Sequence, residues 1–155
     1  MQFSPVVLFV YNRADHFTET FAALSACPEA TETDLFIFAD GPKNEAGKEA
    51  VERCRAAVKS AVQNSVFKSV TVTEAPQNRG LAASVIGGVS EVLSRAGSVI
   101  VLEDDSVVSP YFLHFMNEAL KVFRQDLRIG AVAGYTPAIP FPADYTAEIF
   151  TCYRS

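Results

Sequence analysis

The chain has few charged residues and no long apolar run. Charged residues make up 20% of its 155 residues, and the formal net charge is −5. A general nucleic-acid binder needs a basic surface to meet phosphate, so this balance argues against nucleic acid as a partner. No apolar stretch approaches the roughly 20 residues that cross a bilayer, and no signal peptide precedes the first strand. We therefore expect no transmembrane segment and a cytoplasmic location, with peripheral attachment at the inner face of the membrane left open.

Cysteine is also scarce. Cys27, Cys54 and Cys152 are odd in number and widely spaced, without a CxxC or a Cys/His pattern. Neither a disulfide framework nor a zinc site is therefore indicated. A reducing compartment is the simplest interpretation.

Apolar residues are abundant, at 49% of the chain. At this length they can form the core of one domain. Short β-rich runs alternate with longer helical patterns, which predicts an α/β fold: a Rossmann-like, mostly parallel sheet flanked by helices. The predicted strands span residues 5–11, 34–39, 66–73, 99–102 and 130–135, with a further strand at 149–153 cut short by the end of the chain. The predicted helices span residues 15–26, 45–62, 81–95 and about 110–124.

Some residues mark the ends and the packing of the helices. Asp15 is a predicted N-cap, and Ser109 with Pro110 is a predicted cap and first-turn proline. Gly87 and Gly88 lie within the third helix, where the absence of side chains permits close packing.

The most informative motif is an apolar run that ends in Glu103, Asp104 and Asp105. Adjacent carboxylates repel one another, so such a cluster usually holds a cation or hydrogen-bond donors. Hard oxygen ligands favour Mg²⁺ or Mn²⁺. The alternative is a helix N-terminus, where acidic residues are also favourable. The carboxylates alone leave both interpretations open.

Polar residues follow each of the first four predicted strands. The carboxyl ends of parallel strands lie at one edge of a sheet, where open α/β folds bind ligands. Each short motif alone is explained as a turn or a helix cap, but their joint placement favours a binding site. The residues are Asn12, Arg13, Asp40, Gly41, Asn78, Arg79, Gly80, Glu103, Asp104 and Asp105.

Together these motifs resemble the nucleotide-sugar half of a GT-A glycosyltransferase. The resemblance is carried by residues 5–13, 36–41, 78–81 and 101–105, in that order, and extends over residues 5–125. The acidic cluster is a Glu-Asp-Asp version of the DXD motif, similar to that of the N-acetylglucosaminyltransferases that act on N-glycans.

The resemblance implies a role for each acidic residue. Asp105 would be the direct ligand of Mn²⁺ or Mg²⁺ and bridge to the diphosphate. Asp104 would meet sugar hydroxyls, and Glu103 would contact the ribose or a metal-bound water. Asp40 would accept a hydrogen bond from the imino group of the base.

It also implies that basic and amide groups line the same pocket. Arg13 matches an arginine beside the base and phosphates, and Asn12 precedes it. Asn78, Arg79 and Gly80 match a segment that lines the pocket.

The implied activity is transfer of a hexosyl or N-acetylhexosaminyl group. A UDP-sugar would be the donor and a glycan or glycoconjugate the acceptor, in polysaccharide biosynthesis. Residues 1–155 would form the nucleotide-sugar-binding part, with the acceptor part missing and no catalytic base assigned. The interrupted strand near Phe150 would leave an apolar edge that favours homo-oligomers.

Two other functions remain open. A binding-only module would hold the donor without transferring sugar. A nucleotidyltransferase also uses a metal at a doubly wound sheet, but usually has a Gly-rich loop after the first strand, which residues 12–15 lack. A phosphoacceptor receiver domain is weaker still, because the acids expected after the first strand are absent.

Overall fold

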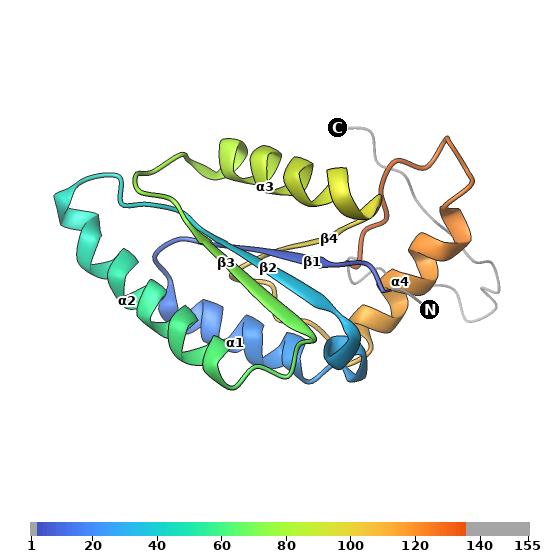
Figure 1. Cartoon of the computed structure of the whole chain (residues 1–155), viewed down its shortest axis with the longest axis horizontal. Helices are drawn as coiled ribbons and strands as arrows, with labels where there is room; N and C mark the ends of the chain where they lie inside the picture. Colours follow the sequence, from blue (N-terminus) through green and yellow to red (C-terminus); the bar gives the residue numbers. More distant parts are fainter. Residues whose placement is uncertain (1–2, 136–155) are drawn as a thin grey trace, which may run out of the picture.

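The computed structural model describes residues 3–135, which form a four-stranded parallel sheet with helices on both faces (Figure 1). The strands are β1 (Val6–Val10), β2 (Asp34–Ala39), β3 (Ser69–Glu74) and β4 (Ile100–Glu103). Their order across the sheet is β3-β2-β1-β4, and every pairing is parallel. The predicted α/β fold is confirmed.

β1 lies in the middle of the sheet and is buried over its whole length. Leu8 is in register with Ile37 of β2 and with Leu102 of β4. A strand covered on both faces has no polar side to show to water, which explains the unbroken Val-Val-Leu-Phe-Val sequence.

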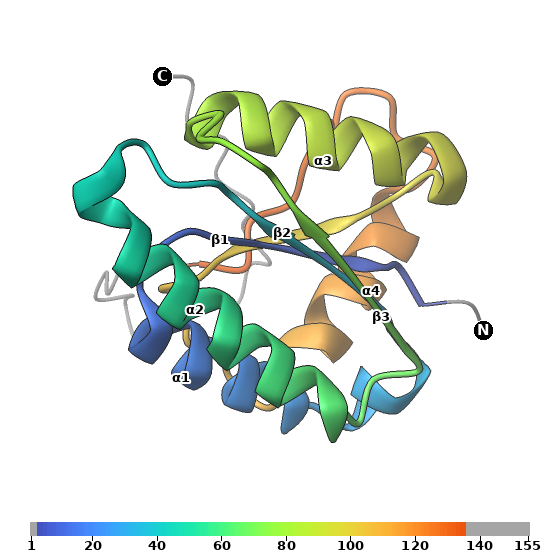
Figure 2. The same ribbon diagram turned by 60° about the vertical axis from the view of Figure 1, so that its left-hand side comes forward.

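One face of the sheet carries the larger part of the core. It is covered by α1 (Ala14–Ser25), α2 (Glu45–Gln63), the short 3₁₀ helix η1 (Pro28–Glu32) and α4 (Phe112–Phe123). Figure 2 shows α1 and α2 side by side beneath the strands. None of the helices in the described part of the chain is long and apolar enough to span a membrane.

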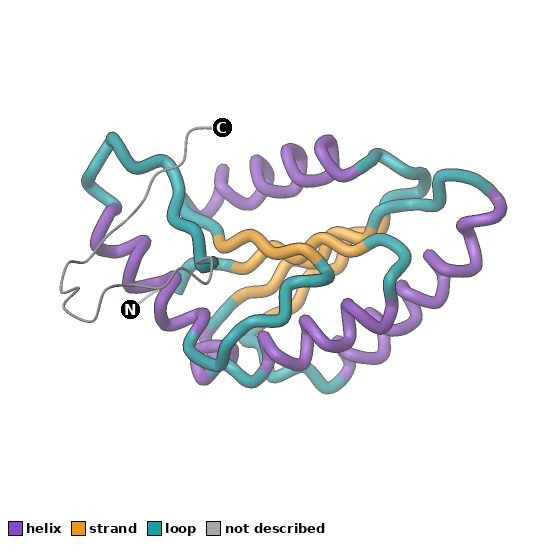
Figure 3. Tube along the Cα trace, turned by 180° about the vertical axis from the view of Figure 1, so that it is seen from behind, coloured by secondary structure: helices purple, strands orange, loops and turns teal. Residues whose placement is uncertain are grey.

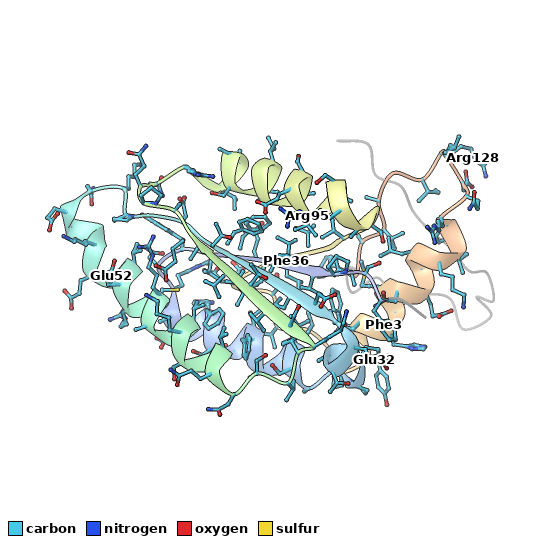
Figure 4. All side chains as sticks on the ribbon, in the orientation of Figure 1. Phe3, Glu32, Phe36, Glu52, Arg95 and Arg128 are labelled. Carbon is cyan, nitrogen blue, oxygen red and sulfur yellow. The ribbon has the colours of Figure 1, made fainter. Side chains whose placement is uncertain are left out.

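The other face is covered by α3 (Leu81–Ala96). A smaller apolar cluster forms there around Val7, Phe9 and Val92. Phe36 packs against the same cluster and lies between the sheet and α3 in Figure 4.

The prediction of a fifth strand at residues 130–135 is wrong: this segment has no strand structure. It runs instead against α4, where a Cβ atom on Gly134 would lie 2.6 Å from Cε2 of Phe112. Most residues of this segment are exposed, so its β-like composition does not mark a buried strand. The predicted strand at 149–153 and the edge near Phe150 lie outside the described residues.

Two predicted helix starts are also corrected. Arg13, not Asp15, is the N-cap of α1, because the amide of Phe17 already donates to the carbonyl of Arg13 at 3.0 Å. Asp15 lies in the first turn, where the helix dipole favours an acid. The carbonyl of Ser109 accepts from the amide of Phe112 at 2.9 Å and closes a turn before the helix. The helix α4 begins at Phe112, with Tyr111 and not Ser109 as its N-cap.

Candidate functional site

The loops after β1, β2, β3 and β4 meet at one edge of the sheet, on the left in Figure 1 and on the right in the reversed view of Figure 3. β1 connects to β2 on one side and pairs with β4 on the other. The point between β1 and β4 is thus a topological switch point, where two loops diverge and leave room for a ligand. All the polar residues predicted from the sequence lie at this edge.

Arg13, after β1, reaches across the switch point to the two aspartates that follow β4. Its guanidinium forms an ion pair with Asp104 and a second one with Asp105, the latter with 3.0 Å between Nη1 and Oδ2. The hydrogen bond to Asp104 is the largest of the effects that raise the pKa of Arg13 above its ordinary value. The arginine is therefore a fixed positive charge at the switch point.

The two aspartates differ in exposure. The side chain of Asp104 is 4% exposed, whereas that of Asp105 is 45% exposed. The backbone of Asp104 is held as well, because Thr20 of α1 donates its hydroxyl hydrogen to the carbonyl at 2.8 Å. The buried Asp104 thus holds Arg13 in place, and Asp105 is the partner that faces solvent. The sugar contact expected of Asp104 remains a prediction.

Cys54 of α2 is buried beneath the same cluster. Burial is the main cause that raises the pKa of its thiol to about 11. A thiol of that pKa is protonated at neutral pH, which argues against a role as a nucleophile.

The exposed carboxylates fit the expected divalent cation. Asp105 and Glu103 are both exposed at the end of β4. Mg²⁺ is commonly held by one or two carboxylates together with substrate phosphates, so this donor set suits an ion shared with a diphosphate. Within residues 3–135, no three Asp, Glu, His or Cys side chains are grouped to hold a metal by themselves. The metal role of Asp105 stays a prediction.

A second polar cluster joins the loops after β2 and β3. Asp40 is 8% exposed as a residue, and its carboxylate accepts four hydrogen bonds. Its Oδ1 accepts from the amides of Gly41 and Arg79, both at 2.8 Å. Its Oδ2 accepts from Nδ2 of Asn78 at 2.9 Å and from the amide of Gly80 at 3.0 Å. The structure therefore brings the predicted residues of these two loops into direct contact.

Arg55 of α2 supports this cluster and was not predicted from the sequence. Its guanidinium donates to the carbonyls of Asp40 and Ala75, the residues that follow β2 and β3. Nothing in the local pattern of a polar surface helix distinguishes this arginine. Thr20 was missed for the same reason, since its partner is 84 residues away.

A cavity of about 400 Å³ opens at the opposite edge of the sheet. Phe3, Ser98, Asn117 and Ile129 are among its lining residues. None of the residues predicted to bind substrate lines it. The candidate site is therefore defined by the chemistry of the charged clusters and not by this cavity.

The fold resembles that of a solved glycosyltransferase. S. aureus TarS, a wall teichoic acid glycosyltransferase, superimposes with a TM-score of 0.51 over 80% of this chain, at 18% sequence identity. The chain has a glycosyltransferase-like fold. At this identity the similarity shows the fold alone.

The other comparisons give no relative. No family model matches the chain, and no curated protein is a significant match. The matched region corresponds to 20% of the TarS chain. Activity, substrate and partners are therefore matters for proposal.

Proposed function

We propose that this chain binds a nucleoside diphosphate sugar, most simply a UDP-sugar, and serves the transfer of that sugar to a glycan or glycoconjugate acceptor. The observation that carries the proposal is the Arg13–Asp104–Asp105 cluster at the switch point of a glycosyltransferase-like fold. A cation and an exposed carboxylate side by side suit a ligand that brings both phosphates and a divalent metal.

Asp105 and Arg13 have different tasks in the cluster. Asp105, with Glu103 beside it, would hold Mn²⁺ or Mg²⁺ against the diphosphate. The metal, when bound, neutralises the charge that develops on the leaving diphosphate. Arg13 supplies a second positive charge from the protein itself, kept in place by the buried carboxylate of Asp104.

Calorimetric titration with UDP, in manganese and in chelator, tests this proposal. We expect UDP to bind the parent chain at least about tenfold more tightly with manganese, because Asp105 contacts the diphosphate only through the metal. Asp105→Asn should remove that difference. Equal affinity for UDP in manganese and in chelator in the parent chain would show that the acidic cluster holds no metal with the nucleotide.

Asp126→Asn is the matched control. Asp126 pairs with Arg128, which lies beyond α4 at the edge opposite the candidate site in Figure 4. This variant should keep the full manganese effect.

Incubation with UDP-sugars and simple acceptors then separates transfer from binding alone, because a binding-only module forms the UDP complex without turnover.

A further inference from the structure

The acceptor capacity of Asp40 is already used within the protein. A carboxylate offers about four lone-pair sites, and here four donors occupy them, two on each oxygen. The residue is buried, with 8% exposure. A base imino group could bind Asp40 only by displacing one of these donors.

The surroundings of Asp40 are equally constrained. Nδ2 of Asn78 also donates to the carbonyl of Gly41 at 3.1 Å. A Cβ atom on Gly41 would lie 2.4 Å from the backbone carbon of Gln77, so the two loops cross with no space for a side chain. Gly80 has a φ of 78°, a backbone conformation that favours glycine. The loop of residues 77–80 is thus fixed from several directions, with Asp40 at its centre.

The exposed member of this loop is Arg79. Its amide is bound to Asp40, while its side chain is exposed at the carboxyl edge of the sheet. Because Asp40 binds the amides of residues 79 and 80, it fixes the backbone from which the guanidinium of Arg79 extends. The loop leads directly into α3, so the arginine stands at the start of that helix.

We propose that Asp40 is a positioning residue that holds residues 78–80, so that Arg79 meets the diphosphate of the nucleotide. This inference rests on the proposed function. It assigns Asp40 to the phosphate end of the ligand, whereas the family resemblance implies a contact with the base.

A contact with the base and a positioning role can be distinguished with uridine and UDP. The affinities of both ligands for the parent chain and for Asp40→Asn are compared in manganese. A base contact is shared by both ligands, so its loss would weaken both equally. A positioned arginine acts on phosphate, so Asp40→Asn should weaken UDP about tenfold and leave uridine nearly unchanged. Equal losses for uridine and UDP would overturn the proposal.

A double-variant cycle tests whether Asp40 acts through Arg79. We expect Arg79→Ala to weaken UDP about tenfold in the parent chain and to have little further effect in Asp40→Asn, because the arginine is already displaced. Additive losses would contradict the coupling. Asp34→Asn, at the other end of the same strand, is the matched control for a general loss of stability and should leave UDP affinity unchanged.

Amide hydrogen exchange without nucleotide provides an independent measurement. The amides of Arg79 and Gly80 donate to Asp40, so both should exchange at least about tenfold faster in Asp40→Asn, and not in Asp34→Asn. Unchanged exchange would overturn this inference alone. Failure of the parent chain to bind UDP would instead overturn the proposed function.

Discussion

At the scale of single residues, Arg13 and a bound metal would compete for the carboxylate of Asp105. Arg13 pairs with the carboxylate of Asp105, the group expected to bind a metal, with 3.0 Å between Nη1 and Oδ2. The side chain of Arg13 is 43% exposed, so the pair is partly screened by water. A cation that binds Asp105 through this oxygen would therefore compete with the arginine.

Arg13→Gln should consequently bind Mn²⁺ alone more tightly than the parent chain does. Releasing an exposed ion pair of about 1 kcal/mol corresponds to a gain of about fivefold in affinity. UDP in manganese should bind more weakly in the same variant, because a positive charge near the phosphates is lost. Electron paramagnetic resonance of free Mn²⁺ measures the first effect, and calorimetry measures the second.

The variant Arg13→Gln with Asp105→Asn is the control for this prediction. With no carboxylate at that position, the gain in Mn²⁺ affinity should disappear. Weaker binding of Mn²⁺ by Arg13→Gln would show that the arginine orders Asp105 for the metal instead of competing with it.

At the scale of elements, α3 depends on one of its two adjacent glycines. A Cβ atom on Gly88 would lie 2.9 Å from Cε1 of Phe9 and 3.0 Å from Cδ2 of Phe38. A Cβ atom on Gly87 would meet nothing within 4 Å. The sequence predicted close packing for the pair, and the structure places it at Gly88 alone.

Gly88→Ala and Gly87→Ala should therefore change stability in opposite directions. We expect Gly88→Ala to lower the free energy of unfolding by about 1–3 kcal/mol through overpacking. Gly87→Ala should raise it by about 0.5–1 kcal/mol, because alanine is the better helix former and meets open space. Urea unfolding followed by circular dichroism measures both. A stability gain in Gly88→Ala would show that α3 stands further from the sheet.

Element boundaries near the site were well predicted from local patterns. The bounds of β2 and the starts of α2 and α3 agree with the sequence, because strong turn signals stand beside them. Residues 130–135 were mispredicted, since a short apolar pattern suits a strand without requiring one, and most of these residues are exposed. Arg55 could not be found at all, because its partners lie on other elements.

For the molecule as a whole, one contribution to stability that is lost in acid comes from the end of β2 opposite the candidate site. There Asp34 accepts from the hydroxyl of Ser69 at 2.6 Å and from Lys68 at 2.9 Å. The hydrogen bond from Ser69, followed by that from Lys68, lowers the pKa of Asp34 below its ordinary value. Because the folded pKa is below the unfolded one, the contribution to stability is complete above the unfolded pKa and is lost as pH falls.

The stability difference between the parent chain and Asp34→Asn should therefore depend on pH. It should be constant above about pH 5 and shrink below about pH 4, where the unfolded carboxyl takes up its proton first. Ser69→Ala, which removes the main cause of the shift, should reduce this dependence. Chemical unfolding between pH 3 and pH 7 (about the range that spans the ordinary pKa of Asp) measures it. A difference that did not vary with pH would contradict the assignment.

The sequence by itself determined the class of fold, the succession of strands and helices, and the polar residues that end each strand. These follow from patterns of a few adjacent residues, which local physics suffices to interpret. Only the tertiary structure decided which of those residues meet. Arg13 and Asp104 are 91 positions apart, and Asp40 and Gly80 are 40 apart. Their contacts arise from the strand order β3-β2-β1-β4, which depends on pairing between distant segments and leaves no trace in any short stretch of the chain.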